Sequence, residues 1–128
     1  MSLRSPLGAV LGTGTARSGV HHFWVQRVTA LALVPLGLWL LVALVRLPLG
    51  DYAAVTNWVG YGANPVLLSL LVGIAAWHSQ LGVQVVVEDY VHAKGLKTLT
   101  LLCSAGAHLL AAAVGIYAVL RIALRSFG

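Results

Sequence analysis

The stretch Trp77–His92, which reads WHSQLGVQVVVEDYVH, decides how the rest of the chain is interpreted. It begins inside a run from Pro65 to Val87 that is free of formal charge and 23 residues long. At about 1.5 Å per residue, a helix of that length crosses the hydrocarbon core of a bilayer. Polar groups at such a depth are costly and are usually kept for function. The sequence therefore predicts a membrane-spanning helix that carries functional side chains.

His78 and Asp89 are eleven positions apart in this stretch. At ~100° per residue, that separation is ~20° beyond three full turns, so both residues lie on one helix face, ~16 Å apart along the axis. Tyr90 lies at the level of Asp89 but ~100° round the helix. One helix therefore presents an imidazole in the membrane interior and a carboxylate with a phenol at the membrane surface.

The composition indicates an integral membrane protein. The 128 residues are 59% hydrophobic and only 9% charged, whereas a soluble domain has about 25% charged residues. The net charge of +5 indicates membrane topology and contact with lipid headgroups. No basic stripe with interleaved aromatic residues is present, so nucleic-acid binding is not expected. The single cysteine, Cys103, lies in an apolar run and is expected to be a packing residue.

The chain is expected to form a single all-α membrane-anchor domain with three transmembrane helices. We expect a polar N-terminal arm at residues 1–22 and helices at about 24–46, 65–90 and 97–121. In the first loop, residues 46–64, Trp58 and Tyr61 suggest a short interfacial segment. In the second loop, Gly95 is expected to break the helix.

The distribution of basic residues predicts the orientation. Three spans put the N-terminal arm and the second loop on one side of the membrane. Five basic residues lie on that side and three on the other: Arg4, Arg17, Arg27, Lys94 and Lys97 against Arg46, Arg121 and Arg125. Since basic residues favour the inner side, we expect the N-terminus inside and the C-terminus outside.

His78 has two interpretations. It is either a histidine that hydrogen-bonds a neighbouring helix or an axial ligand of haem iron, for which neutral imidazole is the usual group. Gly82, one turn later on the same face, favours the haem interpretation because it leaves room for a flat macrocycle. His108 is expected at similar depth, so both a haem held by two histidines of this chain and an ordinary polar contact are sterically conceivable. Spacing alone does not decide between these alternatives.

Asp89 and Tyr90 have a structural and a functional interpretation as well. They are either anchors at the membrane interface or part of a quinone site that also includes His21 and Arg27 on the same side. A quinone carbonyl needs a hydrogen-bond donor, and its reduction needs protons that Tyr, His and Asp can supply. Arg27 suits either a haem propionate or a lipid phosphate. Gln80 and Gln84 are expected to hold helix to helix.

Two motifs resemble a known family. The pattern SGVHHFWVQRVTA at residues 18–30, followed by HSQLGVQVVVEDYV at residues 78–91, resembles the smaller of the two cytochrome b-type membrane anchors of succinate dehydrogenase (complex II). The larger sister anchor is expected to have an R-H-L-type sequence after its haem histidine, where this chain has QVV at residues 84–86. The chain is therefore more similar to the smaller anchor than to the larger one.

The resemblance implies roles for five residues. His78 is expected to be one axial ligand of a b-type haem, with the other ligand from the larger sister anchor. Tyr90 is expected to hydrogen-bond a ubiquinone carbonyl, with support from Asp89. Arg27 is expected near the haem propionates and the quinone, and His21 close by at the inner surface.

The resemblance also implies partners and a location. An iron–sulfur subunit and a flavoprotein subunit with FAD would dock on the inner side, so that the complex passes electrons from succinate to ubiquinone. His22 departs from the family pattern, where relatives carry Asp. The sequence shows no clear targeting segment, which favours a bacterial inner membrane over a mitochondrial one. The alternatives are an anchor of a fumarate reductase or another b-type quinone enzyme, and a small non-redox membrane scaffold.

Overall fold

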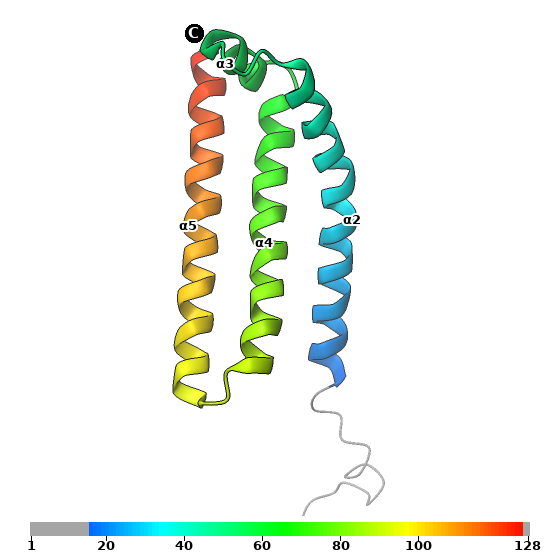
Figure 1. Ribbon diagram of the computed structural model, residues 1–128, viewed down its shortest axis with the longest axis vertical. Helices are drawn as coiled ribbons and strands as arrows, with labels where there is room; N and C mark the ends of the chain where they lie inside the picture. Colours follow the sequence, from blue (N-terminus) through cyan, green and yellow to red (C-terminus); the bar gives the residue numbers. More distant parts are fainter. Residues whose placement is uncertain (1–15, 127–128) are drawn as a thin grey trace, which may run out of the picture.

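The protein is a row of three long helices with a short helix across one end (Figure 1). This computed structural model describes the backbone of residues 16–126 and the side chains of residues 19–125. In chain order, the helices are α2 (Ala16–Arg46), α3 (Tyr52–Gly60), α4 (Asn64–Tyr90) and α5 (Lys94–Ser126). α4 packs between α2 and α5, and α3 packs against α4 and α5. We refer to the two ends of the row as the α3 end and the Asp89 end, the latter where α4 leads into α5.

Three of these helices are long and apolar enough to cross a membrane. They cover Gly19–Arg46, Asn64–Tyr90 and Lys94–Arg125. The prediction of an all-α chain with three candidate membrane-spanning helices is confirmed. The orientation across the membrane stays a prediction.

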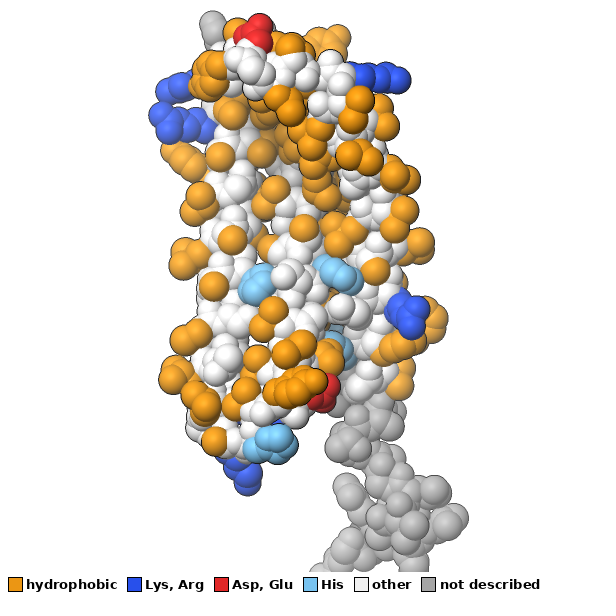
Figure 2. All heavy atoms as spheres, in the orientation of Figure 1, with side chains coloured by type: hydrophobic (Ala, Val, Ile, Leu, Met, Phe, Trp, Pro, Cys, Tyr) orange, Lys and Arg blue, Asp and Glu red, His pale blue; other side chains and the backbone are white. Residues whose placement is uncertain are grey.

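The row of helices buries very few side chains. Among residues 19–125, the buried positions are Thr29, Gly60, Pro65, Val87 and Ala123. Hydrophobic side chains cover much of the visible surface (Figure 2). In a membrane, lipid tails and neighbouring subunits cover such a surface. Within this chain, the long helices pack along two grooves, one between α4 and α2 and one between α4 and α5.

The helix limits differ from expectation at two places. α2 is already helical at Ala16, so the expected arm at residues 1–22 ends earlier, and residues 1–15 lie outside the described part. The prediction used the uncharged run, but helical hydrogen bonds continue past the apolar zone where no proline interrupts them. Gly95 was wrongly predicted as the breaker, because it lies in the first turn of α5 and the chain is extended at Val91.

The first loop contains a short helix, α3, where the sequence suggests an interfacial segment; its position at the interface stays a prediction. Asp51 caps this helix, since its Oδ1 accepts hydrogen bonds from the backbone nitrogens of Ala53 and Ala54 at 2.9 and 3.2 Å. The turn into α4 passes through Gly62 at φ +58°, a conformation that favours glycine. Pro65 follows in the first turn of α4, where a missing N–H costs nothing.

Candidate functional site

His78 hydrogen-bonds across the groove between α4 and α2. Its Nδ1 lies 2.9 Å from Oγ1 of Thr29, a residue only 6% exposed. The hydroxyl of Thr29 also donates to the backbone oxygens of Val25 at 2.8 Å and Gln26 at 3.1 Å. When His78 binds a metal through Nε2, the ring hydrogen is on Nδ1, and Oγ1 of Thr29 is the acceptor that faces it.

This hydrogen bond holds the ring of His78 with Nδ1 toward Thr29. The other ring nitrogen, Nε2, has no hydrogen-bond partner among the described residues. Metal-ligating histidines are typically held in this way, with the second ring nitrogen donating to an oxygen. The described residues contain no group of three or more His, Cys, Asp or Glu that could hold a metal ion. A lone imidazole with a free nitrogen therefore suits an axial position on a metal that a macrocycle already holds.

A hollow of about 500 Å³ lies beside His78 in this groove. Gly82 lines it one turn from His78, and a Cβ added there would meet only Nε2 of Gln26, at 3.9 Å. Nothing in the chain itself therefore requires glycine at this position. The open face agrees with the space that a flat ligand needs.

Two buried polar atoms in the same groove lack partners. They are Oε1 of Gln26, beside the hollow at His78, and Nε2 of His22. A buried polar atom without a hydrogen bond costs about 1–3 kcal/mol. The amide of Gln26 can turn over to present its NH₂ group instead, so a carboxylate such as a haem propionate is a suitable partner. On these grounds the groove fits a haem.

His22 borders a second, more polar hollow nearer the Asp89 end. This hollow has a volume of about 330 Å³ and is also lined by Gly19, Gln84 and Glu88. Gln84 donates to Glu88 on its own helix at 2.8 Å, so the expectation that Gln84 joins two helices is wrong. Polar side chains therefore line both hollows of the groove between α2 and α4, and Val83 and Val86 also line the one at His78.

The four residues predicted around the quinone do not form a closed site in this chain. Asp89 and Tyr90 are the last two residues of α4 and are exposed, Tyr90 by 79%. His21 and Arg27 on α2 are exposed as well, and Arg27 lies over the ring of Phe23, with Cζ 5.0 Å from its centroid. Among the described residues, no hydrogen bond or ion pair joins any of the four. Any binding site here must be completed by another chain.

Comparison with known proteins identifies the chain. The family model described as the succinate dehydrogenase/fumarate reductase transmembrane subunit matches residues 1–120. The chain belongs to this family. It is therefore a membrane-anchor subunit of a succinate dehydrogenase or fumarate reductase, a multi-pass membrane protein whose partners are the other subunits of the complex.

Individual relatives of this anchor subunit have matching names. The succinate dehydrogenase hydrophobic membrane anchor subunit of Rickettsia bellii is 34% identical over 94 residues, which are 73% of this chain and 75% of the relative. That of Rickettsia conorii is 35% identical over 80 residues, 62% of this chain and 64% of the relative. The succinate dehydrogenase membrane anchor subunit of Reclinomonas americana is 29% identical over 89 residues, with shares of 66% and 73%. No solved structure is significantly similar to the chain.

On the other side of α4, His108 of this anchor subunit is fully engaged. Its Nδ1 donates to the backbone oxygen of Ser104 at 2.8 Å, and its Nε2 accepts from the hydroxyl of Ser79 at 3.1 Å. Ser104 in turn donates to Oε1 of Gln80 at 2.7 Å, which confirms that Gln80 joins two helices. These bonds leave no free lone pair on the ring of His108.

The two histidines of the anchor subunit therefore face different grooves. Along α4 they lie close together, because His108 contacts Ser79, the residue next to His78. However, His78 lines the hollow between α2 and α4, while His108 lines one of about 230 Å³ between α4 and α5. The alternative in which both histidines of this chain hold one haem is wrong for this arrangement.

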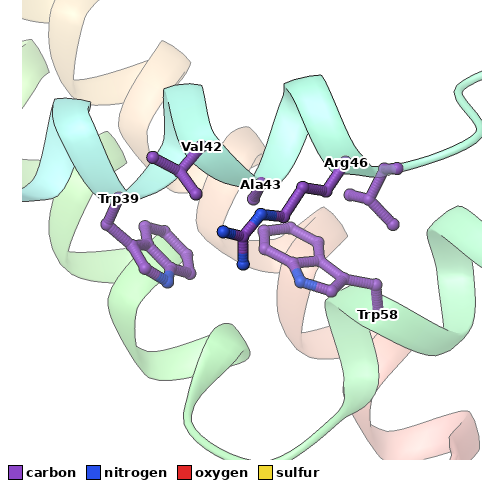
Figure 3. A pocket seen from close by; sticks show the side chains of 6 residues that line it. Trp39, Val42, Ala43, Arg46 and Trp58 are labelled. Atoms are coloured by element: carbon purple, nitrogen blue, oxygen red, sulfur yellow. The ribbon is translucent and has the colours of Figure 1, made fainter.

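At the α3 end, the anchor subunit has an aromatic hollow of about 360 Å³ (Figure 3). Trp39 of α2 stacks on Trp58 of α3, with ring centroids 5.4 Å apart and planes 26° apart. Arg46 points into the same space. The stack fastens α3 to α2.

Sequence reasoning missed the residues of α2 that face α4. Thr29, Gln26 and His22 are spaced three and four apart, so they share a helix face. Phe23 and Arg27, on other positions of the helix, are exposed. That spacing is visible in the sequence, but it does not reveal which helix the face packs against.

Proposed function

We propose that this anchor subunit helps hold a b-type haem and a ubiquinone in succinate dehydrogenase, and so takes part in passing electrons from succinate to quinone. In this proposal His78 is one axial ligand of the haem iron, and the other ligand comes from the larger sister anchor. Tyr90 and Asp89 bind the quinone, with His21 and Arg27 nearby. When bound, the haem accepts and donates single electrons; the chain supplies the surroundings.

One observation carries the haem part of the proposal. Nδ1 of His78 hydrogen-bonds a buried hydroxyl, Nε2 has no partner, and the residue lines an open hollow, whereas His108 has both nitrogens engaged. A histidine that only joins helices gains nothing from an unpaired nitrogen beside a hollow. The unpaired polar atom of Gln26 in the same hollow supports a ligand with a polar edge.

The quinone part is supported by exposure and chemistry. The hydroxyl of Tyr90 and the carboxylate of Asp89 end a helix of membrane-spanning length and make no hydrogen bonds to side chains of the described part. A tyrosine hydroxyl can donate to a quinone carbonyl, and a carboxylate at the membrane surface can take a proton from water and relay it. These groups therefore suit a site that a neighbouring subunit closes.

The partners follow from the family and from chemistry. Oxidation of succinate needs a redox cofactor. We assign that step to a flavoprotein subunit with FAD, connected to the quinone by an iron–sulfur subunit. Both dock at the Asp89 end, which the positive-inside rule places at the inner side of a bacterial inner membrane. The names of the relatives favour succinate dehydrogenase over fumarate reductase.

The proposal is tested on the complex isolated from native membranes through a tag on this chain. A reduced-minus-oxidised visible spectrum should show a b-type haem together with flavin, and the complex should reduce ubiquinone with succinate. Haem without flavin or succinate activity would point to another b-type quinone enzyme. A spectrum without haem from a complex that retains flavin and quinone reduction would refute the haem role.

A further inference from the structure

We infer that Thr29 is a positioning residue for His78: its hydroxyl holds the imidazole in the Nδ1–H tautomer and directs Nε2 to the ligand. The inference rests on the proposed haem function, but it concerns a residue and a hydrogen bond that the function itself does not require. It predicts that removing one hydroxyl on α2 changes the electronic properties of a metal bound to α4.

The direction of the hydrogen bond follows from ligation through Nε2, which uses the lone pair of that nitrogen and so puts the ring hydrogen on Nδ1. Thr29 has one hydroxyl hydrogen, and two backbone oxygens of its own helix share it, at 2.8 and 3.1 Å. What remains on Oγ1 is a lone pair, 2.9 Å from Nδ1 of His78. Since Thr29 is only 6% exposed, water has little access to replace either partner. With Nε2 bound to iron, the Nδ1–H of His78 donates to Oγ1 of Thr29, whose own hydrogen is directed at the backbone oxygens.

The hydrogen bond also fixes the orientation of the ring. A threonine in a helix has a restricted side-chain torsion, and its bond to the preceding turn restricts it further. Turning the His78 ring over would place a carbon against Oγ1 of Thr29 and leave this buried acceptor unpaired. The bond thus selects one ring orientation across two helices, and it provides the acceptor for the Nδ1 hydrogen that ligation through Nε2 requires.

This geometry has an electronic consequence. An oxygen that accepts from the second ring nitrogen raises the basicity of the ligating nitrogen. A more basic imidazole stabilises ferric over ferrous iron and so lowers the reduction potential of the haem. Loss of the hydroxyl should therefore shift the midpoint potential upward, and a freed ring should change the ligand-plane orientation that electron paramagnetic resonance detects.

The test uses two pairs of proteins that differ chiefly by the hydroxyl. The first pair is the wild type and Thr29→Val, which keeps the shape of the side chain without the oxygen. The second pair is Thr29→Ser and Thr29→Ala, which differ by the oxygen alone. The second pair tests the inference even if the valine variant does not assemble. Thr100→Val is the matched control, because the hydroxyl of Thr100 bonds only within its own helix, to the Leu96 oxygen at 2.8 Å.

The readouts are the haem midpoint potential and the resonance spectrum of the oxidised complex. We expect an upward shift and a changed spectrum in both variants that lack the hydroxyl, with values near wild type for Thr29→Ser and Thr100→Val. Unchanged values in the variants without the hydroxyl would overturn the inference. If instead His78→Ala keeps a wild-type haem, the proposed function itself fails, so the two failures are distinguishable.

Discussion

The hydroxyl of Ser104 on α5 donates to Oε1 of Gln80 on α4 at 2.7 Å. This contact joins two of the three helices that are long enough to span a membrane. Water is scarce at such a place, and an unpaired amide oxygen is costly there. Together with the bond from Ser79 to His108, it holds α5 against α4. The groove between α4 and α2 is open by contrast.

Ser104→Ala should destabilise the packing of α5 on α4. Hydrogen bonds between membrane helices contribute about 0.6 kcal/mol on average and up to about 1.7 kcal/mol. The thermal denaturation temperature of the solubilised complex should fall, while the haem spectrum stays as in wild type. Ser69→Ala is the control, since Ser69 bonds only to its own helix, at the oxygen of Pro65; an equal effect of both variants would argue against the interhelical role.

Tyr90→Phe should lower quinone reduction by about tenfold. The change keeps the ring and removes one hydrogen bond to the quinone, about 1.4 kcal/mol. Electron transfer from succinate to an artificial dye, which bypasses the quinone, should be largely intact. Tyr52→Phe is the matched control, because Tyr52 is equally exposed but begins α3 at the opposite end of the row. Equal loss of quinone and dye reduction in the Tyr90 variant would count against a quinone role.

The glycines of α4 and α5 should separate haem binding from helix packing. Gly82→Leu places a large side chain in the hollow beside His78 and should lower the haem content. Gly106→Leu is the control on α5, where an added Cβ meets nothing within 4 Å. Haem content measured per complex should fall only in the first variant, and a normal content there would contradict a haem in this groove.

Gly115→Ala should weaken the packing of α5 on α4 and leave the haem unchanged. An added Cβ would lie 2.9 Å from Cγ1 of Val72, and this valine, stiff at its first torsion in a helix, cannot easily move away. We expect a lower denaturation temperature with an unchanged haem spectrum. A variant as stable as wild type would show that the contact between α4 and α5 is looser than described.

Much of the architecture was predictable from hydropathy. The three long helices follow from uncharged runs, and an interfacial segment around Trp58 and Tyr61 follows from aromatic residues among Gly and Pro. His78 stood out because imidazole is unusual at membrane depth. These features are local, so a single sequence contains them.

The pairing of helix faces was not predictable in the same way. Whether His78 or His108 keeps a free nitrogen depends on which hydroxyl lies opposite, and that depends on the rotation and height of one helix against another. The roles of Thr29 and Ser79 are therefore visible only in the structure. The residues expected around the quinone remain apart in this chain, because the site that we propose needs surfaces from other subunits.

The most direct test of the account compares His78→Ala with His108→Ala. The two histidines have the same chemistry and similar depth, but only His78 has a free nitrogen at a hollow. The reduced-minus-oxidised spectrum of each purified complex should show a lost or shifted b-type signal for His78→Ala and a wild-type signal for His108→Ala. A wild-type signal for His78→Ala would contradict the assignment of His78 as the haem ligand of this chain.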